Sequence, residues 1–171
     1  IDVLHHEHER IEVVGDTALL NNLDRCRDAY DKAMKDCALD LKARIIKEIG
    51  QPSPGHPEGS NDTGRLHSPG TWEIKDGIEK FSKIIYPTVD YAEYVHEGTG
   101  PARGRAQYWP RMSALEPWCR NHGIDNVFLV ARKIHDVGIQ PNKFVDRAMD
   151  SVGDSYSKFM DNALKAAGVV L

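Results

Sequence analysis

Residues 91–100 read Tyr-Ala-Glu-Tyr-Val-His-Glu-Gly-Thr-Gly, and the rest of the chain is organised around this stretch. Its two tyrosines and its valine stand at positions i, i+3 and i+4, which predicts a short helix with one apolar face. Asp90 is the expected N-terminal cap of that helix. The two glycines end it, because glycine adopts positive φ easily and costs about 1 kcal/mol inside a helix.

The loop that follows, residues 101–110, reads Pro-Ala-Arg-Gly-Arg-Ala-Gln-Tyr-Trp-Pro. Its arginines and aromatic side chains suit either phosphate groups or the acidic helices of a neighbouring subunit. Across residues 98–120, four arginines are opposed by Glu116 alone. We favour a protein partner, because a net acidic chain is not typical of a dedicated DNA-binding protein. The residues predicted for this surface are Arg65, Tyr94, Arg103, Arg105, Tyr108, Trp109 and Arg111.

The composition is that of one soluble globular domain. The chain has 171 residues, of which 40% are hydrophobic and 28% charged, and its net charge is −4. No apolar run approaches the ~20 residues that a membrane-spanning helix needs, and the first residues lack the pattern of a signal peptide. The three cysteines cannot all pair within one chain and match no zinc-binding spacing, so we expect reduced thiols in a cytoplasmic protein.

Residues 1–15 are predicted to form a separate acidic arm. Four acidic residues are opposed there by a single arginine, and His5, His6 and His8 lie close together. Closely spaced histidines can chelate a divalent ion, but nothing in the sequence fixes their geometry. We therefore expect no metal site and no cofactor, and one folded domain over residues 16–171.

A long amphipathic helix is predicted over residues 16–49. Asp16 can cap its start, and Gly50 and Pro52 stop its end. At about 1.5 Å per residue the helix is about 50 Å long, whereas a globule of this size is hardly wider than ~30 Å. One end is therefore expected to project beyond the domain, with a coiled coil as the alternative. Its apolar stripe consists of Leu19, Leu23, Cys26, Tyr30, Ala33, Cys37, Leu41, Ile45 and Ile49.

A long loop is predicted after this helix. Residues 51–64 contain three prolines and three glycines, which preclude a helix or a strand. A phosphate-binding loop is excluded, because no Gly-Lys-Ser/Thr sequence follows. Loops of this length inside compact domains are usually functional, so we interpret it as an interaction loop that contacts a neighbouring molecule.

A β-hairpin is predicted next. Residues 71–75 and 78–86 favour strands, and Asp76-Gly77 between them is a strong two-residue turn signal. With such a turn, Trp72 is expected to face Phe81 across the hairpin.

Three more helices are predicted downstream. The first covers residues 112–122, the second begins at a cap formed by Asp125 and ends at Gly138, and the last begins at Pro141. The long helices flank the strands in sequence instead of alternating with them. We therefore predict an α+β fold in which long N-terminal and C-terminal helices pack with a small antiparallel β-sheet and short helices. The apolar stripe of the last helix consists of Phe144, Ala148, Val152, Tyr156, Phe159 and Ala163.

No arrangement of residues indicates an enzyme. An acyl-transfer site needs a nucleophile, a base and an orienting group within reach. Cys119 and His122 are a thiol–imidazole pair, but they lie on a predicted packed helix without a glycine elbow that presents the thiol. His96 and Glu97 are adjacent in a helix and so point in different directions. We predict a non-enzymatic protein with no catalytic residues.

Three segments resemble a known family. Residues 91–100 are similar to the Tyr-Ala-x-Tyr-Val-x-x-Gly-Thr-Gly signature of small neck proteins of tailed bacteriophages. These are head–tail joining or tail-completion proteins, such as the minor tail protein Z of phage lambda. Residues 62–66, Asp-Thr-Gly-Arg-Leu, resemble a turn of that family, and residues 137–145, Val-Gly-Ile-Gln-Pro-Asn-Lys-Phe-Val, resemble the entry into its last helix. The three segments occur in the family's order within residues 16–165. Only the His-Ser-Pro-Gly at residues 67–70 departs from the pattern, where the family has a serine before a strand.

The resemblance implies a structural protein of the virion neck, assembled in the host cytoplasm and with no membrane contact. It implies a homo-oligomeric ring, hexameric in the family, around the DNA channel, with head-closure or connector proteins on one side and tail-terminator or tail-tube proteins on the other. Residues 51–64 and 101–110 would contact neighbouring subunits, and the arginine surface would face a subunit or the DNA. The alternative is a non-enzymatic binding protein that uses residues 103–111 on nucleic acid or on an acidic protein.

Overall fold

The computed structural model describes residues 17–60, 63–79 and 81–168; the predicted acidic arm, its histidines and Asp16 lie outside these ranges. Helices flank a two-stranded antiparallel sheet, which confirms the predicted α+β class. The elements in chain order are α1 (Thr17–Ile49), η1 (Pro69–Thr71), β1 (Trp72–Asp76), β2 (Lys83–Pro87), α2 (Ala92–Glu97), η2 (Gly100–Arg103), α3 (Met112–Asn121), α4 (Val127–Val137), α5 (Phe144–Asp150) and α6 (Ser155–Ala166).

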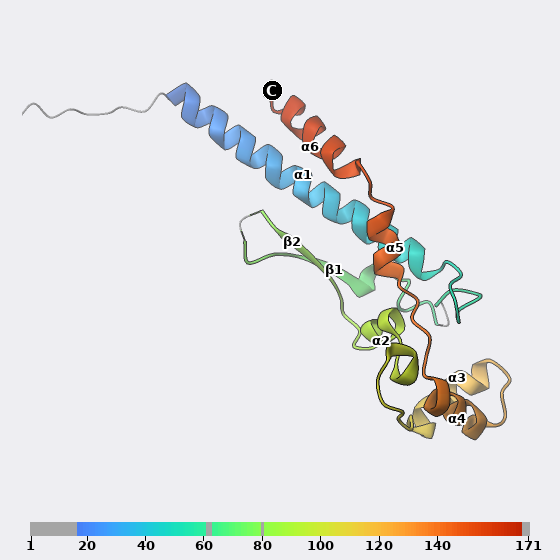
Figure 1. Cartoon of the computed structure of the whole chain (residues 1–171). Coiled ribbons are helices and arrows are strands. Elements are labelled where there is room, and N and C mark those ends of the chain that lie inside the picture. The colour runs from blue at the N-terminus through green and yellow to red at the C-terminus, as the bar shows by residue number, and fades with distance from the viewer. Residues whose placement is uncertain (1–16, 61–62, 80, 169–171) are drawn as a thin grey trace, which may run out of the picture.

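The molecule is elongated along α1 (Figure 1). Helices α5 and α6 follow one side of α1, and the β-hairpin lies along another. Helices α3 and α4 pack against each other at the opposite end of the molecule from the start of α1, and α4 packs on η2. Among the described residues, no helix is both long enough and apolar enough to cross a membrane.

Helix α1 confirms the predicted long helix, which ends where glycine and proline follow it. Its stripe is buried over the second half, at Ala33, Cys37, Ile45 and Ile49. The stripe is not covered at its start, where Leu23 is 58% exposed. The predicted projection of one end therefore corresponds to the start of α1, where the described apolar side chains of Leu20 and Leu23 face solvent.

The last predicted helix is wrong in two respects, because it begins at Phe144 instead of Pro141 and because it is two helices. Helix α5 ends at Asp150 and α6 begins at Ser155, and Gly153 between them has φ 48°. A residue in this left-handed region cannot continue a right-handed helix. The predicted stripe still faces inward, because its α5 residues are buried and its α6 residues are half-buried against α1.

The hairpin is present, but its predicted turn is wrong. Trp72 pairs with Pro87 and Asp76 pairs with Lys83, so residues 77–82 form the connection. Phe81 does not face Trp72, because its ring packs edge-on against Tyr30 of α1 with 5.1 Å between ring centroids. This tertiary contact outweighs the local preference of Asp-Gly for a two-residue turn.

The tip of the hairpin is also held to α1 by charge. The Lys83 ammonium lies 2.8 Å from an Asp31 carboxylate oxygen and 2.6 Å from one of Asp76. These hydrogen bonds raise the pKa of Lys83, and the bond to Lys83 lowers the pKa of Asp76. The two-stranded sheet, which would be marginal alone, is therefore supported by α1 along its length.

Helix α2 turns a different face inward from the one predicted. Ala92 is buried and Val95 packs against the core, whereas Tyr91 and Tyr94 are 38% and 51% exposed. The predicted cap at Asp90 is also wrong, because Tyr91 is the N-cap residue and no side chain caps it. Since α2 has only six residues, Ala92 and Val95, three residues apart, are enough to define its buried face.

Helices α3 and α4 lie where the sequence predicts them. Helix α3 ends with His122 as its C-cap residue. The cap of α4 is Asn126 and not the predicted Asp125, since the Asn126 side-chain oxygen accepts a hydrogen bond from Leu129 N at 3.2 Å. Both residues are good N-caps, so the sequence alone leaves the exact start open by one residue.

The main core lies where the end of α1, the base of the hairpin, α2 and α5 meet. The Trp72 and Phe144 rings pack edge to face at its centre, with 6.0 Å between centroids. The buried members are Ile45, Ile49, Leu66, Trp72, Val89, Ala92, Phe144 and Ala148.

Candidate interaction surface

Two of the three family-like segments lie side by side at one place, which we call the junction: residues 95–100 and 138–143. The Thr99 amide donates to the Ile139 carbonyl at 2.9 Å, and the Ile139 amide donates to the Thr99 hydroxyl at 3.1 Å. The Asn142 amide donates to the Val95 carbonyl at 3.0 Å. The chain thus returns, after α3 and α4, to the point from which it left.

Glycines make this close approach possible. Gly98 (φ 75°, ψ −175°) and Gly138 (φ 81°, ψ −176°) adopt a backbone conformation that is essentially restricted to glycine. A Cβ at Gly138 would lie 2.0 Å from the Thr99 carbonyl oxygen, and one at Gly98 would lie 2.5 Å from that of Ile139. Gly98 and Gly138 are therefore required because the two backbone segments pack too closely to admit a side chain.

The third family-like segment reaches the same core. Its Asp62 lies outside the described residues, but Leu66 is buried and its carbonyl accepts a hydrogen bond from the Trp72 indole at 2.9 Å. The preceding loop, predicted to lack helix and strand, is tied to the junction by side chains. His56 Nε2 lies 2.6 Å from the Gln140 carbonyl oxygen, and the Asn142 amide nitrogen lies 2.5 Å from the Ser60 hydroxyl.

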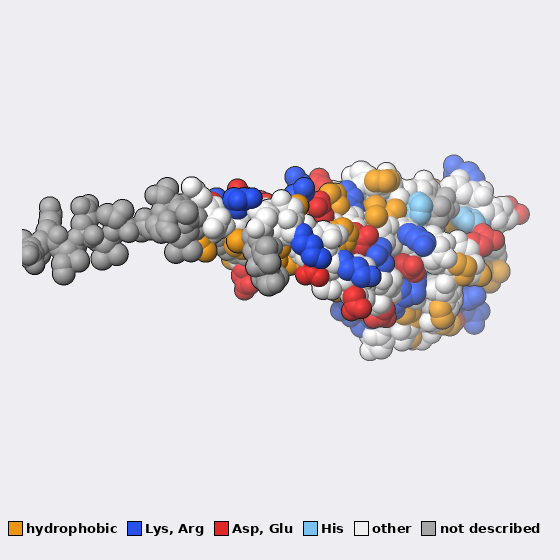
Figure 2. Space-filling model, turned by 90° about the horizontal axis from the view of Figure 1, so that it is seen from above, with side chains coloured by type: hydrophobic (Ala, Val, Ile, Leu, Met, Phe, Trp, Pro, Cys, Tyr) orange, Lys and Arg blue, Asp and Glu red, His pale blue; other side chains and the backbone are white. Residues whose placement is uncertain are grey.

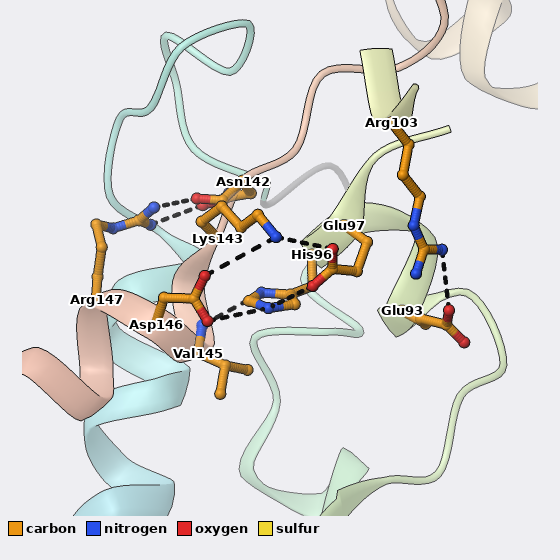
Figure 3. A network of polar contacts seen from close by, with 9 residues as sticks. All are labelled: Glu93, His96, Glu97, Arg103, Asn142, Lys143, Val145, Asp146 and Arg147. Carbon is orange, nitrogen blue, oxygen red and sulfur yellow. Dashed lines mark hydrogen bonds and ion pairs between the residues drawn. The ribbon is translucent and has the colours of Figure 1, made fainter. Parts of the chain in front are cut away.

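Polar groups inside the junction have partners within the chain (Figure 3). The Arg147 guanidinium donates to the Glu48 carboxylate at 3.0 Å and to the Glu48 carbonyl at 2.7 Å. It also donates to the side-chain oxygen of Asn142 at 2.6 Å and to its carbonyl. Asn142 is 1% exposed. These bonds join the end of α1, the junction and α5.

His96 lies between two carboxylates in the same region (Figure 3). Its Nε2 is 3.2 Å from Glu97 and 3.5 Å from Asp146, and its Nδ1 accepts a hydrogen bond from the Val145 amide at 3.4 Å. Burial lowers the pKa of His96, although the two carboxylates act against this. Glu97 is held ionised, because a hydrogen bond from Lys143 lowers its pKa. The sequence predicted that the His96 and Glu97 side chains point in different directions, and this was wrong, because the two are in contact. Their contact belongs to a cluster of ion pairs that links α2 to α5.

The loop at residues 101–110, which we call the arginine loop, begins within η2 and is fixed at its base. The Arg105 amide donates to the Gly100 carbonyl at 2.9 Å, and the Tyr108 hydroxyl donates to that of Thr99, also at 2.9 Å. Arg103 forms an ion pair with Glu93 at 2.9 Å (Figure 3). The loop is thus an ordered extension of the junction, and it presents its arginines from a defined backbone.

The structure brings four of the seven predicted site residues together. Tyr94, Arg103, Arg105 and Tyr108 line one hollow of about 490 Å³. Trp109 lies apart from this hollow, stacked on His135 and Phe128 of α4 with centroid distances of 4.3 and 5.9 Å.

The other two predicted residues are elsewhere. Arg65 lines a larger hollow of about 710 Å³, which lies between residues 55–60 and 63–66, α2 and the Trp118 side of α3. Arg111 is the N-cap residue of α3. The prediction missed Phe128 and His135, whose spacing of seven residues in α4 was the available signal that they share a face.

The arginines of this region differ in whether their guanidinium groups are already bound to a carboxylate of the chain. Arg103 is occupied by Glu93, whereas Arg65, Arg105, Arg111 and Arg120 are exposed and form no ion pair with any residue that the structure describes. Exposed guanidinium groups next to aromatic side chains can bind carboxylates or phosphates. The chemistry of this surface is therefore suited to carboxylate or phosphate groups.

The Cys119–His122 pair is not arranged as a nucleophile and its base. Cys119 is 1% exposed. The His122 ring stacks on Trp118 with 4.3 Å between centroids, and its Nδ1 lies 2.9 Å from the Trp118 carbonyl oxygen. Within the described part of the chain, no three His, Cys, Asp or Glu side chains gather as a metal site would need.

Comparisons of the chain with models of protein families, with curated proteins and with solved structures found no match. The resemblance to phage neck proteins therefore remains a prediction from three sequence segments.

Proposed function

We propose that this chain is a non-enzymatic structural protein of the neck of a tailed bacteriophage, where it joins the head connector to the tail. One observation carries the proposal: the three segments that resemble this family, although distant in sequence, are all used to build one junction and its core. Residues 95–100 and 138–143 are hydrogen-bonded to each other in the junction, and Leu66 of the third segment is buried in the core beside it. Their occurrence together and in order thus has a structural reason, which supports a shared fold over chance similarity.

The surface of the chain also suits an assembly subunit. Large apolar side chains are exposed at both ends, among them Leu20 and Leu23 on α1 and Phe128 and Leu129 on α4. Exposed apolar groups and unpaired arginines are typical of surfaces that contact another protein. On this proposal the chain forms a ring, hexameric by analogy with the family, around the DNA channel of the virion. Head-closure or connector proteins and tail-terminator or tail-tube proteins are its neighbours.

Electron microscopy of the encoding phage tests the neck role. Removal of this gene is expected to give DNA-filled heads and separate tails, and expression of the wild-type chain in trans is expected to restore joined particles. Normally joined particles in the absence of the gene would contradict the proposal.

A second candidate function is a binding protein that uses the arginine loop on nucleic acid. It is favoured by Arg105 and Arg111, which are free of ion pairs with described residues and adjoin Tyr108 and Trp109 in sequence. Replacement of Arg105 and Arg111 by glutamine would then abolish binding of duplex or single-stranded DNA, and wild-type affinity would fall steeply with salt. Electrophoretic mobility shifts over a salt series measure both effects.

A further inference from the structure

The hollow lined by Tyr94, Arg103, Arg105 and Tyr108, which we call the tyrosine–arginine hollow, has the size of a binding site. It lies where α2, η2 and the arginine loop follow one another in the chain. Its volume of about 490 Å³ falls within the range of about 300–1,000 Å³ that is usual for ligand pockets. The rest of its lining comes from Gly98, Thr99, Gly100, Ala106 and Ile139.

The walls of this hollow are held in place by the chain itself. The Tyr108 hydroxyl is hydrogen-bonded to that of Thr99 at 2.9 Å, and the Arg105 amide donates to the Gly100 carbonyl at 2.9 Å. A Cβ at Gly100 would lie 3.3 Å from a Tyr108 ring carbon, so this ring lies against the backbone of the junction. A site whose walls are already fixed loses less conformational freedom when a partner binds.

The hollow keeps two hydrogen-bond donors that the described chain does not use. Arg105 is exposed and has no ion pair with a described residue, and the Tyr94 hydroxyl has no hydrogen bond to one. The neighbouring Arg103, by contrast, already binds the Glu93 carboxylate at 2.9 Å (Figure 3). A carboxylate accepts several hydrogen bonds at once, and those from a guanidinium are among the strongest. The two unused donors therefore suit a second carboxylate.

The apolar part of the hollow indicates what accompanies that carboxylate. Tyr94 is 51% exposed and Tyr108 is 37% exposed, and Ala106 and Ile139 add aliphatic groups to the lining. Exposed tyrosine rings beside an arginine are typical of the centre of protein interfaces, where they pack against apolar side chains. The lining thus combines one site for an anion with a surface for an apolar group.

The charges around the hollow favour a protein over a nucleic acid. Sites for single-stranded nucleic acid place aromatic rings along a positively charged groove that follows several phosphates. Among the lining residues, Arg105 is the one cation without an ion pair to a described residue, and the Glu93 side chain beside Arg103 is 63% exposed. On the face seen in Figure 2, the described basic and acidic side chains are interspersed and form no continuous basic stripe. One carboxylate fits these charges better than a row of phosphates.

We propose that the tyrosine–arginine hollow binds a segment of a partner protein in which an aspartate or glutamate stands next to an apolar residue. Arg105 binds the carboxylate, the Tyr94 hydroxyl donates to it, and the apolar neighbour packs on the two tyrosine rings. Arg103 stays bound to Glu93, which limits the hollow to one carboxylate. The inference rests on the proposed function, since it takes the partner to be a neighbouring protein of the neck.

Nuclear magnetic resonance titration of the full chain with two capped peptides tests this site. The first peptide is acetyl-Ala-Leu-Glu-Leu-Ala-amide, and the second carries glutamine in place of its glutamate. The acidic peptide is expected to shift the backbone amide signals of Gly98, Gly100 and Arg105 until they saturate. The neutral peptide is expected to bind at least about 10-fold more weakly, because it lacks the charge-assisted hydrogen bonds.

Four single variants separate the contributions to binding, and circular dichroism checks that each one is folded. Arg105→Gln is expected to reduce the affinity for the acidic peptide to that for the neutral one. Arg120→Gln is the matched control, because Arg120 is also exposed and unpaired among described residues but does not line the hollow. Tyr94→Phe removes the hydroxyl alone and is expected to weaken the acidic peptide about 3-fold. Glu93→Gln releases Arg103 and removes a negative charge, so it is expected to strengthen the acidic peptide about 2- to 5-fold.

Several results would overturn the inference. The site is wrong if the acidic peptide gives no saturable shifts up to about 10 mM, or if both peptides bind equally. It is also wrong if Arg105→Gln binds normally, if Arg120→Gln loses binding, or if Glu93→Gln binds more weakly. A short oligothymidylate that shifts the same signals at lower concentration than the acidic peptide would identify a nucleic-acid site instead.

The neck role is judged separately, by complementation of the gene deletion. If the Arg105→Gln chain fails to bind the acidic peptide but restores joined particles, the hollow is not a neck contact and the neck role stands. If it restores none although it is folded, both are supported. If heads and tails join without the gene, the neck role fails whatever the peptide data.

Discussion

Arg147 and Arg105 show how the two regions of this molecule differ. Arg147, at the junction, donates to the Glu48 carboxylate and carbonyl and to both oxygens of Asn142. Arg105, in the loop that leaves the junction, is exposed and has no ion pair with any described residue. In the junction the fold itself satisfies the polar groups, whereas in the loop their hydrogen-bonding capacity remains for a partner. The two side chains are chemically identical, so the difference comes from what lies around each of them.

The largest expected effect comes from the backbone of the junction. Gly138→Ala places a Cβ against the Thr99 carbonyl in a conformation that only glycine adopts readily, and is expected to cost about 4 kcal/mol or to prevent folding. Chemical denaturation measures the loss. Gly104→Ala is the matched control, because Gly104 also has positive φ but its Cβ would meet nothing within 4 Å; it is expected to cost about 1 kcal/mol. Equal losses would mean that the junction is not tightly packed.

Replacement of the two arginines tests the comparison directly. Arg147→Met leaves the buried Asn142 side chain and Glu48 without their donor and is expected to reduce the free energy of unfolding by about 2 kcal/mol. Arg105→Met removes no bond to a described side chain and is expected to change it by less than about 0.5 kcal/mol. Both are measured by urea denaturation at neutral pH. Similar values for the two would remove the distinction between structural and available arginines.

A smaller effect is expected from His96. Its pKa is lowered by burial, with Glu97 and Asp146 acting against and Lys143 and Arg147 acting with this shift. A folded-state pKa below the ordinary 6.5 means that the unfolded chain takes up the proton first. The contribution of His96 is therefore complete above about pH 6.5 and is lost as the pH falls through the folded-state pKa. The measurement is the stability difference between the wild type and His96→Gln at about pH 8 and about pH 5. This difference should move against the wild type at acid pH, and a constant difference would contradict the assignment.

The smallest expected effect is on the arginine surface. The double substitution Arg105→Gln and Arg111→Gln is expected to change the free energy of unfolding by less than about 0.5 kcal/mol. Its melting curve should overlay that of the wild type, even where binding of a partner is lost. A clearly lower melting temperature would show that these arginines belong to the fold, as Arg147 does.

Sequence patterns predicted the parts of this fold that depend on local chemistry. The C-terminal end of α1 was predictable because glycine and proline stop a helix regardless of its surroundings. The hairpin connection was not, since Phe81 packs on Tyr30, which lies far away in sequence. The break at Gly153 was missed because one glycine within a good apolar stripe is compatible with either a continuous or a divided helix.

The candidate surface was predicted in part. Tyr94, Arg105 and Tyr108, which line the smaller hollow, lie within one continuous stretch of sequence, so the sequence was sufficient to group them. The role of Arg147 was not predictable, because its partner Glu48 is 99 residues away and both read as ordinary charges on a helix surface. Contacts across such distances require the fold before they can be assigned.

The return of the chain at the junction has a practical consequence. Thr99 and Ile139 are hydrogen-bonded neighbours. The segment at residues 103–137 is therefore joined to the rest of the chain at two points that lie close together. Units attached in this way can be exchanged, because ends that lie close together tolerate domain insertion. A fluorescent or affinity module with adjacent termini could therefore replace α3 and α4 while the long helix, its companions and the hairpin keep their positions. The same pair of attachment points would allow a different recognition element to replace this segment during evolution, while the rest of the fold stays unchanged.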